Sequence, residues 1–129
     1  MSATVLLCDP SPDQREMYAE ALHHAGFNVI ECADGRPAYD IALQMRLAAI
    51  VTEVGTDGDG CGWRLIDRLR HNTLTASVPI VALVSRQIVG DRCRALEVGV
   101  DRCFVTPLTP AELITAVAQV ATSTATGQR

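Results

Sequence analysis

Two acidic residues follow apolar segments of the chain and could form a site together. Asp9 comes directly after the segment 5–8, and Glu53 comes shortly after the segment 48–51. Ser85 and Thr106 follow two further apolar segments and would add hydroxyl groups nearby. Two carboxylates that face each other could form a functional site, but short polar residues at strand ends also cap the helices that follow. A site therefore requires a fold that brings these residues to one place.

Five apolar segments have the length of strands, and helical patterns separate them. The first, third and fourth are apolar without alternation, as is typical of parallel strands that are covered on both faces. The predicted strands are Val5–Cys8, Asn28–Cys32, Ala48–Val51, Ile80–Val84 and Cys103–Val105.

Helix start signals follow these strands. In SPDQ, Ser11 is the expected N-cap, Pro12 is the first helical residue and Gln14 completes a capping box. This helix ends near Gly26, another follows 34–35, a third spans about 63–70, and TPAE at 109–112 begins the last. The apolar stripes predicted for the helices comprise Met17, Tyr18, Ala21, Leu22 and Ala25; Ala38, Ile41, Ala42 and Met45; Val89, Cys93 and Leu96; and Leu113, Val117 and Val120.

Strands and helices thus alternate five times, which predicts an α/β domain with a doubly wound five-stranded parallel sheet and five helices. In the strand order 2-1-3-4-5, ligands bind at the carboxyl edge between strands one and three. Asp9 and Glu53 would face each other there. We expect one domain over residues 1–122 and a disordered tail over 123–129, where STATGQR has no helical period.

Composition excludes several classes of protein. The net charge is −4 and no basic stripe occurs among the 129 residues, so a nucleic-acid surface is not expected. No apolar run approaches the roughly 18 residues of a membrane span, and the first residues lack a leader pattern, which together predict a cytoplasmic protein. The cysteines lack a CxxC pair and are expected to be reduced and mostly packed; they are Cys8, Cys32, Cys61, Cys93 and Cys103.

The segments VLLCDPSPDQREM, IVTEV, PIVALVS and RALEVGVDRCFVTPLTPAEL together resemble a response-regulator receiver domain over residues 4–121. The resemblance implies a flavodoxin-like signalling domain of a two-component phosphorelay, not an enzyme. In this family an aspartate at the end of strand three accepts a phosphoryl group from a histidine kinase. Mg²⁺ is held by that aspartate, an acidic pair after strand one and a carbonyl. A Thr or Ser, a Lys and a mobile aromatic residue complete the apparatus.

The chain departs from the family pattern at most of these positions. Of the expected acidic pair only Asp9 is kept. The remaining positions carry Pro10 in place of the second acid, Glu53 in place of the phosphoacceptor, Val84 in place of the hydroxyl, Thr106 in place of the lysine and Cys103 in place of the aromatic residue. Ser85 lies one place late for the hydroxyl and on the opposite face of an extended chain. This is the pattern of a degenerate receiver, or pseudo-receiver.

Each departure removes part of the chemistry, because phosphoryl transfer depends on positioning and on neutralising charge. We therefore expect a phosphorylation-independent module that acts by binding protein, with no required cofactor and at most weak Mg²⁺ binding by Asp9 and Glu53. Glu53 would either imitate a phosphorylated aspartate or merely replace the lost acceptor.

Two other functions remain open at this point. A histidine kinase could still phosphorylate Glu53 or Asp57 with Mg²⁺, and, more remotely, the cysteines could form a thiol-based sensor. The family implies partner binding, to a histidine kinase, an output protein or a second copy, through the face formed by helix four, strand five and helix five. The charged residues expected on that face are Arg86, Arg92, Arg94, Glu97, Asp101 and Arg102.

Overall fold

The strands form one parallel sheet whose order matches the prediction. The computed structural model describes residues 3–54, 62–84 and 99–126. Its sheet has the order β2-β1-β3-β4-β5, and all four neighbouring pairs are parallel. The strands are β1 (Thr4–Cys8), β2 (Asn28–Cys32), β3 (Ala49–Val54), β4 (Ile80–Val84) and β5 (Arg102–Val105).

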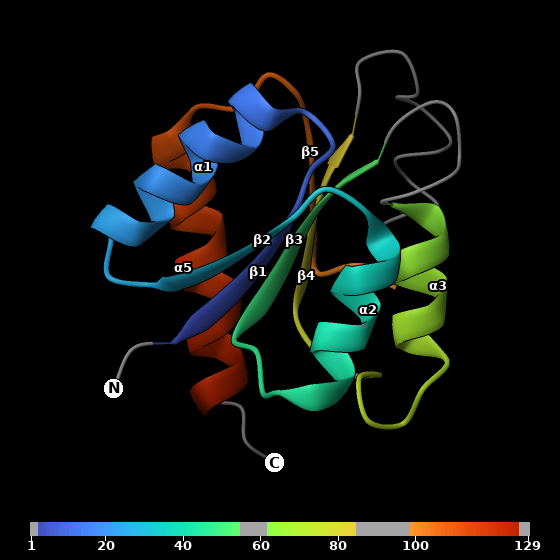
Figure 1. The fold of residues 1–129 in the computed structure, drawn as a ribbon. Coiled ribbons are helices and arrows are strands. Elements are labelled where there is room, and N and C mark those ends of the chain that lie inside the picture. The colour runs from blue at the N-terminus through green and yellow to red at the C-terminus, as the bar shows by residue number, and fades with distance from the viewer. Residues whose placement is uncertain (1–2, 55–61, 85–98, 127–129) are drawn as a thin grey trace.

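Helices cover both faces of this sheet, as doubly wound folds require. The helices are α1 (Pro12–His24), α2 (Gly35–Gln44), α3 (Trp63–Arg70) and α5 (Pro110–Thr126). Figure 1 shows α1 and α5 on one face of the sheet and α2 and α3 on the other. The predicted helix with Val89, Cys93 and Leu96 lies outside the described residues, as does Ser85.

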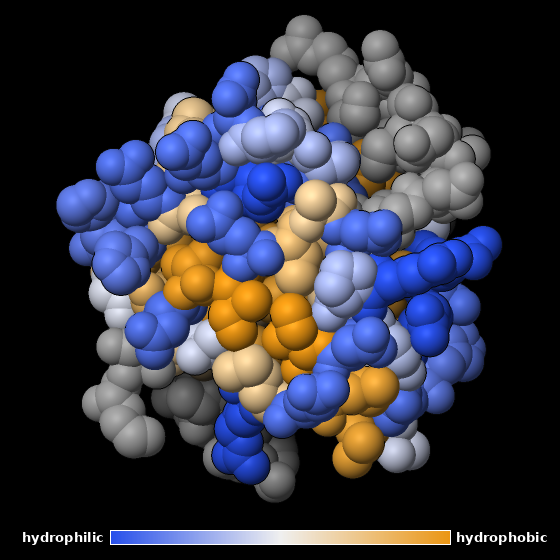
Figure 2. Space-filling model, viewed as in Figure 1, coloured by the Kyte–Doolittle hydropathy of each residue, from blue (hydrophilic) through white to orange (hydrophobic). Residues whose placement is uncertain are grey.

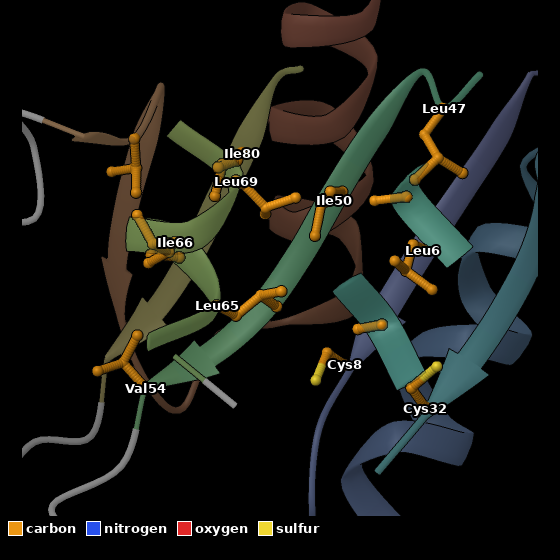
Figure 3. Close-up of a cluster of buried hydrophobic side chains, with 14 of the residues drawn as sticks. Leu6, Cys8, Cys32, Leu47, Ile50, Val54, Leu65, Ile66, Leu69 and Ile80 are labelled. Carbon is orange, nitrogen blue, oxygen red and sulfur yellow. The ribbon is translucent and has the colours of Figure 1, made fainter. Parts of the chain in front are cut away.

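The sheet divides the core into two apolar layers. Side chains of the strands alternate between the layers, and the central strands β1, β3 and β4 are buried on both sides, which explains their continuous apolar sequences. Leu6, Ile50 and Ile80 point toward α2 and α3 (Figure 3). On the opposite face the α5 stripe is buried as predicted, through Leu113, Val117 and Val120.

Two predicted helix stripes are wrong in part. On α1 the buried residues are Tyr18, Ala19 and Leu22, whereas Met17 is 43% exposed and Ala25 is also exposed. The hydroxyl of the buried Tyr18 donates to the carbonyl of Leu108 at 2.7 Å, which turns this face of α1 toward the β5–α5 connection.

On α2 the stripe fails at its end. Ala38 and Ala42 are buried as predicted, but the helix ends at Gln44. Met45 has an extended backbone and is 41% exposed, because it no longer follows the helical rotation.

Two boundaries also differ from expectation. Strand β3 continues to Val54, so Glu53 lies within the strand rather than after it. Helix α5 continues to Thr126 and so includes residues 123–126, which were expected in the tail.

The edge strand β2 is less covered than the central strands. Figure 2 shows apolar side chains gathered at the centre of the face that carries β2, with polar side chains around them. Val29 and Ile30 of this strand are partly buried, and Phe27 and Ile41 beside it are as well. None of the helices in the described ranges is long and apolar enough to cross a membrane.

Arg70 at the end of α3 ties together the segments that enter β4 and β5. Its guanidinium donates to the carbonyls of Gly99 at 2.7 Å, Ala76 at 3.0 Å and Val78 at 2.7 Å. It also contacts Asp101 Oδ2 at 3.3 Å, and the same oxygen accepts a bond from the Ile80 amide at 2.7 Å. Asp101, which was expected on a partner-binding surface, is exposed and also holds this part of the scaffold together.

Candidate functional site

The register of β1 and β3 brings Asp9 and Glu53 to the same edge of the sheet. Cys8 of β1 pairs with Thr52 of β3. Asp9 directly follows Cys8, and Glu53 directly follows Thr52. Asp9 is 1% exposed and Glu53 is half-buried. Pro10, beside Asp9, is exposed and offers no carboxylate.

Both carboxylate oxygens of Asp9 accept hydrogen bonds from the start of α1. The Ser11 amide donates to Oδ1 at 2.9 Å, and Gln14 Nε2 donates to Oδ2 at 2.6 Å. The predicted capping box is therefore only half formed. The backbone N–H of Gln14 donates to the Ser11 hydroxyl at 3.4 Å, as predicted. The side chain of Gln14, however, binds Asp9 instead of the Ser11 backbone.

Arg15 adds a positive charge to this group of residues. Its Nη1 donates to the backbone carbonyl of Asp9 at 2.7 Å, and its Nε lies 3.5 Å from Oε1 of Glu31 on β2. Burial raises the pKa of the Asp9 carboxyl above its ordinary value of 3.8, while the bonds from Ser11 and Gln14 and the charge of Arg15 lower it.

At the other side of the edge, Thr106 donates hydrogen bonds to the backbone of Val84. Val84 is the last residue of β4 and is completely buried. Its carbonyl accepts from the Thr106 amide at 3.0 Å and from the Thr106 hydroxyl at 3.4 Å. These are the positions at which the family resemblance places a hydroxyl and a lysine.

The aromatic position on β5 carries a small side chain, and the aromatic ring of this strand lies on the other face. Cys103 is half-buried and packs on the layer of α2 and α3. Phe104 packs on the layer of α1 and α5, where the Arg102 guanidinium lies 5.0 Å from its ring centre. Phe104 therefore cannot take the place of the expected aromatic residue.

Gly62, the residue before α3, packs directly on the end of β3. It has φ 107°, and a Cβ at this position would lie 3.0 Å from the Val54 Cα and 3.2 Å from the Glu53 carbonyl oxygen. Both the backbone conformation and the close approach require glycine. This contact fixes the backbone of Glu53 against the start of α3.

The cysteines are not all reduced, contrary to expectation. Cys8, which is fully buried at the end of β1, is disulfide-bonded, whereas Cys32 and Cys103 are not in disulfides. Cys61 and Cys93 lie outside the described residues. Burial raises the pKa of the Cys32 thiol, which makes it a poor nucleophile.

The described residues fit a magnesium ion poorly. Mg²⁺ needs near-octahedral oxygen ligands at about 2.0–2.1 Å. Within the ranges 3–54, 62–84 and 99–126, no three acidic, histidine or cysteine side chains converge on a common point. Asp9 is already bonded at both oxygens, and the adjacent Pro10 supplies no second carboxylate.

The sequence interpretation missed Arg15 and assigned Gln14 only to helix capping. A signal was present, because both residues lie in the first turn of the helix that follows Asp9. Local spacing does not predict that the Gln14 side chain binds Asp9 instead of the helix terminus. Nor does it predict that Arg15 contacts Glu31.

Comparison with known proteins decides the family. Residues 5–118 match the family model of the response regulator receiver domain. The chain belongs to this family. This receiver is 29% identical over 124 residues to the phosphate regulon transcriptional regulatory protein PhoB of Pseudomonas aeruginosa. The match covers 96% of this chain and 54% of that protein. It is 32% identical over 111 residues to the response regulator Rre1 of Synechocystis, covering 85% of this chain and 48% of that protein.

The receiver spans about half the length of these curated relatives. Among solved structures, it resembles the chemotaxis response regulator CheY4 of Vibrio cholerae with a TM-score of 0.81 and 26% identity over 93% of this chain and 99% of that one. It also resembles the receiver domain of the Pseudomonas aeruginosa histidine kinase PA1611, which has a magnesium ion in its active site cleft. That match has a TM-score of 0.81 and 25% identity over 95% of this chain and 100% of that one.

Proposed function

We propose that this receiver acts in two-component signalling without being phosphorylated, by binding a protein partner in the cytoplasm. The observation that supports this most directly is the chemistry of the residues at Val84 and Thr106. The two positions that would contact a phosphoryl group hold an apolar side chain and an uncharged hydroxyl, which lies 3.4 Å from the backbone carbonyl oxygen of Val84. Without a cation, the charge on the equatorial oxygens would not be neutralised.

Glu53 alone does not restore the reaction. Its side chain is one methylene longer than that of aspartate, so an acyl phosphate on it would lie farther from any ligand at Asp9. Asp9 and Glu53 would then bind Mg²⁺ weakly at most. The alternative of phosphorylation at Glu53 or Asp57 by a histidine kinase needs such a metal; Asp57 lies outside the described residues.

The proposed docking surface lies on β5 and α5. A groove of about 340 Å³ lies between them, and the residues that line it are Arg102, Phe104, Ala111, Glu112, Thr115, Ala116 and Gln119. Arg102 is held over the Phe104 ring and donates to Gln119 Oε1 at 2.6 Å, so a positive charge is fixed at its edge. Arg86, Arg92, Arg94 and Glu97 of the expected surface lie outside the described residues.

This surface fits a protein partner with complementary charge, either a histidine kinase or an output protein, and a second copy is the alternative. Arg102→Glu would reverse the charge at the groove. Sedimentation of the purified chain tests the homodimer, with Arg46→Glu as an exposed control outside the groove. If the chain is a dimer that Arg102→Glu dissociates and Arg46→Glu leaves intact, the second copy is the occupant.

Fluorescence of Trp63 tests independence from phosphorylation. Trp63 begins α3, next to the contact of Gly62 with the end of β3, and is half-buried. We expect no saturable change when Mg²⁺ and then beryllofluoride, a phosphoryl analogue, are added. A saturable change that needs both additions contradicts the proposal and favours the phosphorylated receiver.

A thiol-based sensor is a second candidate, favoured by the disulfide at Cys8. In a cytoplasmic protein a disulfide more often serves redox sensing or catalysis than structure. Cys8 directly precedes Asp9, so reduction of this bond would act beside the pocket. Thiol titration with and without reductant, compared between the wild type and Cys8→Ser, would show whether the bond forms and breaks reversibly.

A further inference from the structure

We propose that Gln14 and Arg15 close the pocket around Asp9, so that a fixed guanidinium charge stands where the family resemblance implies a divalent cation. The inference deepens the proposed function, because it names what keeps this receiver from binding a metal. It rests on hydrogen-bond geometry at Asp9 and not on the departures at Val84, Thr106 and Cys103.

The first step concerns the carboxylate itself. Asp9 is 1% exposed, and its two oxygens already accept bonds from the Ser11 amide at 2.9 Å and from Gln14 Nε2 at 2.6 Å. A metal that approached Oδ2 would have to share that oxygen with the Gln14 amide group or displace it. Displacement would cost the half-buried Gln14 amide its 2.6 Å bond to Oδ2, so Gln14 opposes metal binding.

The second step concerns charge. Arg15 Nη1 lies 2.7 Å from the carbonyl oxygen of Asp9, and the family resemblance assigns Mg²⁺ to the acidic residues of this same edge. A guanidinium keeps its charge at all physiological pH values, and a like charge beside a site repels a divalent cation. Arg15 therefore holds a positive charge beside Asp9, and this charge opposes a metal there.

The third step concerns why Arg15 stays in place. Its Nε lies 3.5 Å from Glu31 Oε1 on the edge strand β2, and its side chain is only 21% exposed. The arginine is thus held from two sides, by the Asp9 carbonyl and by the Glu31 carboxylate. Glu31 positions Arg15, and Arg15 and Gln14 together close the pocket.

The experiment measures Mn²⁺ binding, with no phosphoryl donor present, from the loss of the free-ion electron paramagnetic resonance signal. Mn²⁺ is suited to the test because it prefers oxygen ligands, as Mg²⁺ does. The wild type is compared with the double variant Gln14→Ala/Arg15→Ala and with Arg36→Ala, a matched control that removes an exposed arginine from the first turn of α2. Circular dichroism checks that each variant is folded.

We expect the double variant to bind one Mn²⁺ at least about tenfold more tightly than the wild type and Arg36→Ala, the size of effect that a single neighbouring charge has on an ionic site. Adding Asp9→Asn to the double variant should abolish the gain. Mn²⁺ should also raise the melting temperature of the double variant but not that of the wild type.

Two results would overturn the inference: equal Mn²⁺ affinity in the wild type and the folded double variant, or a gain that survives Asp9→Asn. If Gln14 and Arg15 only cap the helix, the double variant loses stability and gains no metal. Because no phosphoryl donor is used, each of these results is independent of whether the receiver can be phosphorylated. The single variants Gln14→Ala and Arg15→Ala provide the same comparison if the double variant does not fold.

Discussion

Asp9 shows how the neighbours of a carboxylate determine what it can do. It is buried, and protein donors occupy both of its oxygens. Thr106 and Val84, at the far side of the same edge, are likewise bonded to each other. At the scale of single residues, the Asp9 carboxylate is therefore fully hydrogen-bonded within the protein.

Glu112 provides a pH-dependent prediction at this scale. Hydrogen bonds from the backbone amide and hydroxyl of Thr109, both 2.9 Å long, lower the pKa of Glu112 below its ordinary value of 4.5. Since the folded protein favours the ionised form, Glu112 stabilises the fold above pH 4.5, and this contribution disappears as the pH falls through the lowered pKa.

Glu112→Gln should consequently lower the urea midpoint at neutral pH, and its difference from the wild type should shrink as the pH falls below 4.5. Urea unfolding at several pH values measures this. The control Glu20→Gln changes an exposed glutamate of α1. A difference of constant size across the pH range would refute the assignment.

At the scale of elements, the contact between Gly62 and the end of β3 positions the site. Strand β3 carries Glu53, and α3 begins directly after Gly62. A side chain at Gly62 would contact backbone atoms, which cannot move without shifting the strand or the helix.

Gly62→Ala and Gly26→Ala form a matched pair that tests this contact. Both glycines have positive φ, 107° and 102°, but a Cβ at Gly26 meets nothing within 4 Å. Backbone strain alone should cost Gly26→Ala about 1 kcal/mol of unfolding free energy, and the contact with β3 should cost Gly62→Ala about 1–3 kcal/mol more. Urea unfolding measures both variants, and equal losses would mean that the contact is unimportant.

The elements were largely predictable, because strand sequences and helix start signals are local. The capping box at Thr109 and Glu112 formed as predicted, and so did the strand order. Which face of α1 is exposed was not predictable, since Met17 and Tyr18 begin two overlapping apolar stripes. The hydrogen bond from Tyr18 to Leu108, which is far away in the sequence, favours burial of the stripe that begins at Tyr18. The same holds for Arg15, whose partner Glu31 lies on another strand.

At the scale of the whole molecule, the chain has the fold of a receiver, and our proposal concerns only the carboxyl edge of its sheet. The two core layers, the parallel sheet and the cover of helices follow the family closely, with a TM-score of 0.81 to CheY4 of Vibrio cholerae. The proposed docking surface is the groove between β5 and α5. A domain of this kind would present one constant binding surface instead of switching between two.

The most direct test of this account is the intact mass of the protein after incubation with acetyl phosphate and Mg²⁺. We predict no change in mass for the wild type. A combined variant with Pro10→Asp, Glu53→Asp, Val84→Thr and Thr106→Lys restores the family residues at four of the five changed positions, leaving Cys103. A complete receiver treated alongside shows that the reagents are active. Addition of one phosphoryl group to the wild type, lost on Glu53→Gln or Asp57→Asn, would contradict the account.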